Sequence, residues 1–248
     1  MIVLLPPSET KRDGGDGPPL RIGELGSPAL EALRAELVDD LVALAADAPA
    51  CRSALGLSAK QDAELARNAA LLSSPTLPAI NRYTGVLYDA LDVESISRAA
   101  ASRARARLAV GSALFGVLRA DDLVPAYRLS ATSKLPDRST LAARWKPVLE
   151  PELARMAADE LIVDLRSGSY AALGRVPGAV EVDVLAEHAD GRRTVVSHFN
   201  KAHKGRLARV LATSRAEPDD AAGVAAIARR AGLRVERRGN ELTVVTSA

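Results

Sequence analysis

Two tight-turn signals in the C-terminal third of the chain constrain its fold most strongly. Apolar and polar residues alternate over 179–188 and 193–199, on either side of Asp190-Gly191. This pattern predicts a β-hairpin, and a second one is expected about Gly239-Asn240, between 235–237 and 242–245. The strands of a hairpin run antiparallel, so a purely parallel sheet is excluded.

Strands and helices alternate along the rest of the chain. Short apolar runs predict buried strands at 2–5, 107–110 and 161–165. Pro147 and Pro151 are expected to break or kink the helix that contains them. We therefore predict an α/β fold, a single domain over residues 1–248 with a mixed β-sheet and flanking helices. The expected helices begin at Ser27-Pro28, at a capping box on Ser58, at Ser95 and at Ser139, and two more cover 207–211 and 221–231.

The composition is that of an ordinary globular protein. Of the 248 residues, 48% are apolar and 26% are charged, which places the chain far from intrinsic disorder. No apolar run approaches the roughly 18 residues that a membrane helix needs. The apolar start, residues 1–7, has no basic region before it and is interpreted as a first strand rather than a signal peptide. The single cysteine, Cys51, excludes an internal disulfide and fits a reducing compartment, so we expect a cytoplasmic protein.

Positive charge is unevenly distributed on a nearly neutral chain. The net charge is only +2, yet basic residues cluster over 98–107 and 201–209, so a local basic groove is compatible with the sequence. Lysine is the rarer choice: six of the 33 basic residues are Lys and the rest are Arg. Three of the six, Lys11, Lys201 and Lys204, fall in segments that other features also single out. A lysine ammonium has a pKa that its surroundings adjust more readily than that of an arginine.

The first of these segments, Pro6 to Lys11, directly follows the first strand. Ligands of open α/β sheets bind at strand ends, and a Ser/Thr/Lys set suits a phosphate or another anion. Glu9 would act as an acid or base. The alternative is a proline-terminated turn with exposed polar residues. The glycine spacing of a Walker loop is absent.

The second segment runs from Gly111 to Arg119. Its two glycines suggest close backbone approach, to a ligand, to DNA phosphates as in a helix-hairpin-helix element, or simply to packed side chains. The paired acids Asp121 and Asp122 suggest solvated caps rather than a metal site.

The third segment, Ser197 to Arg206, is expected to leave a strand, cross a polar turn and open a helix. Its lysines suit an anion at a helix N-terminus, and a solvated basic loop is the alternative. His198 and His203 lie five residues apart without a third ligand, which disfavours zinc. The turn 164–170 lacks the glycines of a nucleophile elbow, which disfavours a serine hydrolase.

Taken together, these segments resemble the YaaA family in content and order. The matching residues run from residue 2 to about 215. They are Pro7-Ser8-Glu9-Thr10-Lys11, Tyr83-Thr84-Gly85, Gly116-Val117-Leu118-Arg119, Pro125-Ala126-Tyr127-Arg128-Leu129, Arg144-Trp145, Ser167-Gly168-Ser169-Tyr170 and Lys201-Ala202-His203-Lys204-Gly205-Arg206.

The resemblance implies a protein of the hydrogen peroxide stress response that helps limit free intracellular iron. It also implies a compact α/β fold with a basic cleft and a helix-hairpin-helix-like element associated with DNA binding. No cofactor, metal or catalytic step is implied. The residues that the resemblance assigns to the cleft are Lys11, Arg119, Arg128, Lys201, Lys204 and Arg206.

Two hypotheses about function remain open at this point. In the first, the protein binds the DNA phosphate backbone without sequence preference, and its affinity falls steeply with salt. In the second, it is an enzyme or binding protein for a nucleotide-like or other anionic small molecule. Lys11 and Lys201 would then clamp the anion, and Glu9 or His198 would transfer protons. A deep pocket that brings Lys11 and Lys201 to one ligand would favour the second hypothesis, and a long open groove the first.

Overall fold

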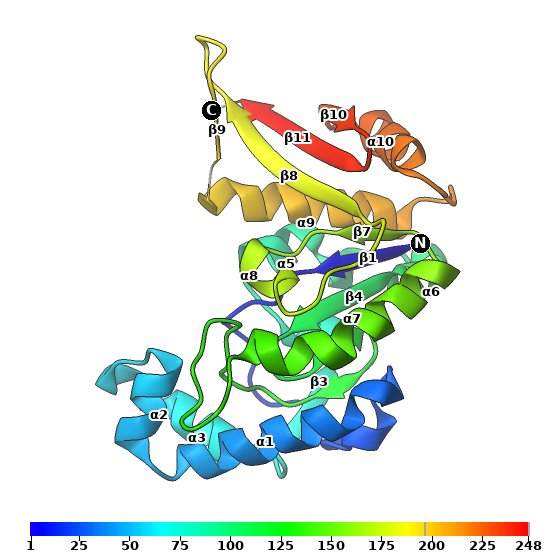
Figure 1. Cartoon of the computed structure of the whole chain (residues 1–248). Coiled ribbons are helices and arrows are strands. Elements are labelled where there is room, and N and C mark those ends of the chain that lie inside the picture. The colour runs from blue at the N-terminus through cyan, green and yellow to red at the C-terminus, as the bar shows by residue number, and fades with distance from the viewer. Residues whose placement is uncertain (196, 248) are drawn as a thin grey trace.

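The first strand, β1 (Ile2–Leu5), runs through the middle of the main sheet. Figure 1 shows the computed structural model, which describes residues 1–195 and 197–247. All four side chains of β1 are buried, as expected of an interior parallel strand. Pro6-Pro7 follows at once and ends the strand, because proline cannot donate to a sheet ladder.

The main sheet has the order β10-β11-β8-β7-β1-β4-β5, with β9 paired to β8. Neighbouring strands are parallel from β11 to β4, whereas the pairs β10–β11, β8–β9 and β4–β5 are antiparallel. The predicted mixed sheet and both predicted hairpins are therefore confirmed. The strands are β4 (Leu108–Ser112), β5 (Gly116–Arg119), β7 (Ile162–Asp164), β8 (Val180–Glu187), β9 (Arg193–Val195), β10 (Val235–Arg238) and β11 (Glu241–Ser247).

A second, small sheet and most of the N-terminal helices lie on one side of the molecule, at the bottom of Figure 1. The strands of this small sheet, in the order β2-β3-β6, are two to four residues long. One contiguous apolar core links this part to the main sheet. The elements are β2 (Gly17–Pro19), β3 (Pro75–Pro78), β6 (Leu123–Val124), α1 (Glu31–Ala45), α2 (Ala48–Leu55) and α3 (Asp62–Ala69).

The remaining helices surround the main sheet. Helix α9 packs against β1, β8, α5, α6 and α10, and Figure 1 shows α7 crossing in front of β4. In the part of the chain that the structure describes, no helix combines the length and apolar character needed to cross a membrane. These helices are α4 (Ala79–Arg82), α5 (Val86–Leu91), α6 (Arg98–Arg107), α7 (Leu141–Asp159), α8 (Gly168–Ala171), α9 (Ser197–Thr213) and α10 (Ala221–Arg230).

Several helix boundaries follow from local chemistry that the sequence shows. The capping box at Ser58 is present, with Gln61 bonding back to the Ser58 amide at 3.0 Å. Gly232, just beyond α10, has φ +83°, a conformation that favours glycine after a helix end. Of the two effects predicted for Pro147 and Pro151, a break or a kink, the break is excluded, because one helix runs through both prolines. Both prolines lie on its exposed side, where water can reach the carbonyls that lose their helical partners.

Two other expectations need correction. The predicted strand 193–199 ends at Val195, and α9 begins at Ser197, so the segment Ser197 to Arg206 is helical rather than a loop. The helix-hairpin-helix element is not confirmed, because the segment Gly111 to Arg119 forms the buried hairpin of β4 and β5. A Cβ atom on Gly116 would lie 2.7 Å from the Trp145 ring, so this glycine serves packing.

Candidate functional site

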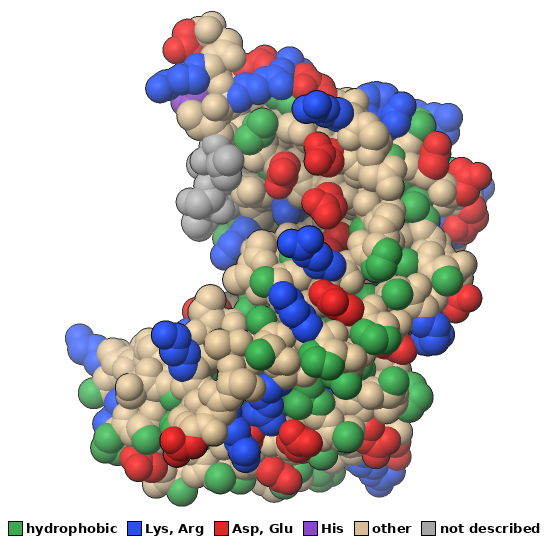
Figure 2. Space-filling model, viewed as in Figure 1, with side chains coloured by type: hydrophobic (Ala, Val, Ile, Leu, Met, Phe, Trp, Pro, Cys, Tyr) green, Lys and Arg blue, Asp and Glu red, His purple; other side chains and the backbone are tan. Residues whose placement is uncertain are grey.

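The candidate site lies at the carboxyl edge of the main sheet, between the ends of β1 and β7. From β1 the chain continues to one side of the sheet, toward β4, and from β7 it continues to the other side, toward β8. Loops that diverge in this way leave a crevice, where open α/β sheets bind ligands. A cavity of about 680 Å³ opens there. Figure 2 shows the molecule hollowed at the left, on the side to which the tip of β1 points in Figure 1.

One wall of the cavity is the loop after β1. Ser8, Glu9 and Thr10 line it, and the Ser8 and Thr10 hydroxyl oxygens lie 3.1 Å apart. The Thr10 hydroxyl also donates to the Thr84 carbonyl at 3.3 Å, which joins this loop to the start of α5. Gly85 has φ +96°, and a Cβ there would come within 3.4 Å of both hydroxyl oxygens. Glycine at this position therefore keeps the two hydroxyls and α5 close together.

The opposite wall is the turn after β7. Arg166 is buried and is held by the carboxylate of Asp164 at 2.7 Å and the Gly174 carbonyl at 2.9 Å. This pairing uses the guanidinium to shape the turn. Ser167 and Ser169 project from it into the cavity, with their hydroxyl oxygens 3.2 Å apart. This turn therefore supplies hydroxyl groups rather than free charge.

Helix α9 supplies the positive charge of the cavity. Lys201 is exposed at the cavity, and Lys204, one turn further, is buried in its lining. The Lys204 Nζ atom donates to the Leu165 carbonyl at 3.0 Å, the one acceptor found for it among the described residues. Burial lowers the pKa of Lys204, and the carboxylates of Asp183 and Asp164 oppose that shift. An ammonium with three N–H groups and one protein acceptor has room for a ligand.

Lys11 lies behind the β1 loop rather than in the cavity lining. Its Nζ atom donates to the carbonyls of Ser8 at 3.0 Å and Glu9 at 3.4 Å. It also lies 4.1 Å from the centroid of the Tyr127 ring. Burial, with Arg128 as the next cause, lowers the pKa of Lys11 to about 7. The expected clamp of Lys11 and Lys201 on one ligand is therefore not the arrangement present.

The structure brings together only part of the predicted set. Lys201 and Lys204 line the cavity, while Arg128 does not line it but pairs at 2.8 Å with Glu9, which does. Arg119 lies at the far end of β5, opposite Ala109 and bonded to the Ala106 carbonyl, away from the carboxyl edge. Arg206 is exposed on α9 and does not line the cavity.

Sequence reasoning missed other residues of the lining. Asp183 is one of the exposed positions of β8, where buried and exposed residues alternate. Ser130 and Thr132 come from a long loop with no distinctive motif. The alternation along β8 marks Asp183 as outward-facing, but strand order alone decides that it faces this cavity. The side chain of His198, considered as a proton carrier, lies outside the described residues.

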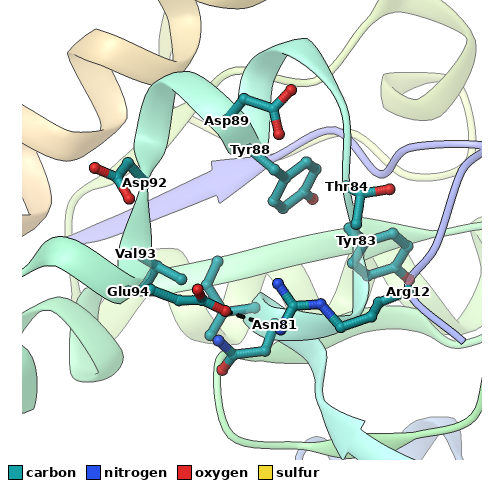
Figure 3. Close-up of a pocket in the computed structure, with 10 residues that line it drawn as sticks. Arg12, Asn81, Tyr83, Thr84, Tyr88, Asp89, Asp92, Val93 and Glu94 are labelled. Atoms are coloured by element: carbon teal, nitrogen blue, oxygen red, sulfur yellow. Dashed lines mark ion pairs between the residues drawn. The ribbon is translucent and has the colours of Figure 1, made fainter. Parts of the chain in front are cut away.

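A smaller pocket lies on the other side of the segment that connects α4 and α5. It has a volume of about 130 Å³ and shares Thr84 and Tyr88 with the main cavity. Figure 3 shows Asp89, Asp92 and Glu94 around it, with Glu94 joined to Arg12. The nitrogen and oxygen of that ion pair are 2.8 Å apart.

Acidic side chains of the described residues do not form a metal centre. No group of three or more His, Cys, Asp or Glu side chains among them is arranged to hold a metal ion. Asp122 accepts from the amides of Gly26 at 2.9 Å and Arg119 at 2.8 Å, and Asp121 pairs with Arg105. The two aspartates thus act as a loop cap and a surface ion pair.

Comparison with known proteins places this site in a family context. The model of the family described as peroxide stress protein YaaA matches residues 1–238. The chain belongs to the YaaA family. Similar proteins, all named UPF0246 proteins, occur in Corynebacterium efficiens (51% identical, 95% of each chain), Corynebacterium glutamicum (48%, 99% of each) and Streptomyces coelicolor (43%, 95% of this chain and 92% of the relative).

Four of the seven segments that carry the YaaA resemblance meet at the cavity. Residues 8–11, 83–85, 167–170 and 201–204 are far apart in sequence, yet all line the cavity or lie directly behind its wall. The Gly116–Arg119 and Arg144–Trp145 matches instead lie in or beside the core, where the Trp145 indole donates to the Ala113 carbonyl at 2.8 Å. Within this YaaA protein, four of the matching segments thus converge on one site.

Proposed function

We propose that this YaaA protein serves the peroxide stress response by binding a nucleotide-like anionic small molecule in the cavity between β1 and β7. The observation that carries the proposal is the Lys204 ammonium. It is buried in the cavity lining, beside Lys201, with one protein acceptor at 3.0 Å. A buried cation of this kind is stabilised by an anion that accepts its remaining N–H groups.

The other lining groups indicate which kind of anion would fit. Hydroxyls of Ser8, Ser167 and Ser169 line the cavity and can donate to phosphate oxygens, whereas the Thr10 hydroxyl donates to the Thr84 carbonyl. Asp183 adds a carboxylate to the same lining, which disfavours a bare anion and favours a ligand that also carries hydroxyl or amino donors. A volume of about 680 Å³ suits a small molecule of that size. A nucleoside monophosphate or a sugar phosphate combines both features.

DNA binding is the second candidate, and it has its own support. Lys201 and Arg206 are both exposed on α9, so this helix presents positive charge to large ligands as well. Several other basic side chains of the two clusters are engaged inside the protein: Arg103, Arg107 and Arg209 donate to backbone carbonyls. Fewer basic side chains of the two clusters are therefore available to contact DNA phosphates than the sequence suggests. The geometry therefore favours the small molecule.

Localisation and iron belong to the proposal as well. Cys51 is a free, buried thiol, which supports a reducing compartment such as the cytoplasm. An effect on free intracellular iron stays a prediction from the family resemblance.

Calorimetric titration tests the proposed function. Wild type, Lys204→Met, Lys201→Ala and the exposed control Lys146→Met would each be titrated with AMP, ribose 5-phosphate, inorganic phosphate and a short DNA duplex at several salt concentrations. We expect saturable AMP or ribose 5-phosphate binding that weakens roughly tenfold or more in Lys204→Met, because a charge-assisted contact is lost, and no change in Lys146→Met. Duplex binding that falls steeply with salt, without binding of either phosphate ester, would contradict the proposal and favour DNA.

A further inference from the structure

Lys11 is a buried cation that the anion site does not use directly, because its side chain does not line the cavity. Its Nζ atom instead donates to two successive carbonyls of the cavity wall, Ser8 at 3.0 Å and Glu9 at 3.4 Å. The remaining side of the ammonium faces aromatic rings, with the Tyr127 centroid at 4.1 Å and the Tyr83 centroid at 5.3 Å. Cations are attracted to ring faces at such distances.

The aromatic support of Lys11 is itself held in place. The hydroxyl groups of Tyr83 and Tyr127 are hydrogen-bonded at 2.8 Å, and Tyr127 is bonded to the Ser112 hydroxyl at 2.7 Å. Ser112 accepts from the Phe115 amide in the buried hairpin of β4 and β5. Lys11 therefore connects the loop after β1 to the buried core of the sheet.

The loop is also attached to the rest of the protein at other points. Beyond Lys11, the main chain of residues 10–12 bonds to the α4–α5 segment through the Thr84 amide at 3.3 Å and the Arg82 carbonyl at 2.8 Å. Among the described hydrogen bonds, the carbonyls of Ser8 and Glu9 have Lys11 as their donor. Lys11 is thus the donor to both peptide carbonyls of this wall, whereas the Thr10 hydroxyl and the Glu9 side chain are held separately, by the Thr84 carbonyl and by Arg128.

Charged groups reach Lys11 from several elements. Arg128, in the segment after β6, and Arg67, in α3, disfavour the ammonium form, whereas Glu64, in α3, and Glu9, in the loop itself, favour it. Burial raises the pKa of Tyr83 and Tyr127, so both rings stay neutral. Burial is the largest cause of the low pKa of Lys11, about 7, so the ammonium loses its proton near neutral pH.

We propose that Lys11 is a positioning residue that holds the Ser8–Thr10 wall of the cavity in its ligand-binding arrangement, and that this hold depends on the Lys11 proton. When Lys11 is protonated, the Ser8 and Glu9 carbonyls accept charge-assisted hydrogen bonds and the tyrosine rings contact a cation. When Lys11 is neutral, both kinds of interaction weaken and the cavity wall is held less firmly. The ligand part of this inference rests on the function proposed above, whereas the loop part does not.

Two NMR titrations between pH 5.5 and 9 test the inference. Because the chain has six lysines, 13Cε labelling of lysine would resolve Lys11 in the wild-type protein. We expect its signal to titrate with a midpoint near 7. The backbone amides of Ser8, Glu9 and Thr10 are expected to follow with the same midpoint. In Lys11→Met, which keeps the side-chain length without charge, these amides should show no step near neutral pH, and Lys146→Met should behave as wild type.

Sulfate provides the ligand readout, because its charge is constant over this pH range. In wild type we expect the affinity for sulfate to fall roughly fivefold between pH 6 and 8.5, because the two bonds from Lys11 to the Ser8 and Glu9 carbonyls lose their charge assistance. In Lys11→Met the affinity should be independent of pH and close to the wild-type value at pH 8.5. A sulfate profile that keeps the wild-type step in Lys11→Met would overturn the positioning role.

The outcomes for the loop and for the ligand are separable. A Lys11 midpoint above 10, or loop amides that titrate unchanged in Lys11→Met, would overturn the inference whether or not sulfate binds. If sulfate and the phosphate esters fail to bind the wild-type protein while the loop amides titrate with Lys11, the proposed function is wrong and the proton-dependent hold on the loop stands. If Lys11→Met does not fold, the 13Cε midpoint and its agreement with the wild-type amide midpoints decide the matter.

Discussion

Arg34 illustrates how this chain uses its arginines inside the fold. The side chain is fully buried and its guanidinium donates to the carbonyls of Phe115 at 2.9 Å, Gly26 at 2.7 Å and Val117 at 2.8 Å. Burial lowers the pKa of Arg34 to about 10. A planar fork with five donors can satisfy carbonyls from separate segments at once, which lysine cannot. Arginine is therefore a structural residue here, and the lysines at the cavity are the chemically distinct ones.

Replacing Arg34 should destabilise the fold. In Arg34→Met, the buried carbonyls of Phe115 and Val117 and the half-buried carbonyl of Gly26 lose their donor, so we expect the free energy of unfolding to fall by about 3 kcal/mol. Urea denaturation at pH 7 measures the change. Arg21→Met is the control, because Arg21 is exposed and pairs with the exposed Glu24, and it should leave the free energy of unfolding nearly unchanged. An Arg34→Met variant as stable as wild type would refute the structural role.

The low pKa of Lys11 predicts that the stability of the protein depends on pH. This pKa is about 7 in the folded protein and near the ordinary lysine value of 10.5 in the unfolded chain, so between these pH values the unfolded state binds more protons. The free energy of unfolding of wild type should therefore rise with pH from this group, by on the order of 3 kcal/mol between pH 7 and 9.5. Lys11→Met lacks this rise.

The measurement is chemical denaturation of wild type and Lys11→Met at pH 6, 7, 8 and 9.5. The stability of the variant relative to wild type should be highest at and below pH 7 and decrease steadily above it. Parallel pH profiles for the two proteins would contradict the low pKa of Lys11.

At the scale of elements, the contact between α5 and α9 positions the cavity lysines. Gly205 lies on α9 next to Lys204, and a Cβ atom there would lie 2.2 Å from the Leu87 carbonyl oxygen of α5. The two helices thus approach at a point where only glycine fits. Because α5 begins at the cavity wall and α9 carries Lys201 and Lys204, this contact fixes the distance between wall and lysines.

Gly205→Ala should separate these helices. We expect the free energy of unfolding to fall by roughly 2 to 3 kcal/mol, since overpacking forces the backbones apart. Gly168→Ala is a matched control, because a Cβ atom on this helical glycine meets nothing within 4 Å. Alanine in a helix should keep or slightly raise stability there. Thermal unfolding of both variants tests the idea, and equal effects at the two glycines would count against the close contact.

The elements that the sequence predicted are those with strong local signals. The apolar run of β1, the capping box at Ser58 and the turns at 190–191 and 239–240 all specify their structure within a few residues. The start of α9 was missed because 193–199 alternates like a strand, whereas β9 ends at Val195 and α9 begins at Ser197. Strands β3 and β6 were missed because two to four residues carry too little periodicity.

At the scale of the whole molecule, strand order decides which residues share the cavity. The loops after β1 and β7 come from positions about 160 residues apart, and only the placement of β7 beside β1 makes them opposite walls. The rarity of lysine in the sequence singles out Lys11, Lys201 and Lys204. The sequence does not show that Lys11 lies behind the cavity wall while the other two line the cavity. It also could not separate Arg119, at the far end of β5, from the cavity.

Hydrogen–deuterium exchange with and without AMP tests the central claim most directly. We expect AMP to protect residues 8–10, 84–88 and 167–170 of the wild-type protein together, because the proposed site joins these segments. The same protection should be absent in Lys204→Met and retained in Lys146→Met. Protection that appears only with a DNA duplex and follows the exposed side of α9 around Arg206, or none at these three segments, would contradict a small-molecule site between β1 and β7.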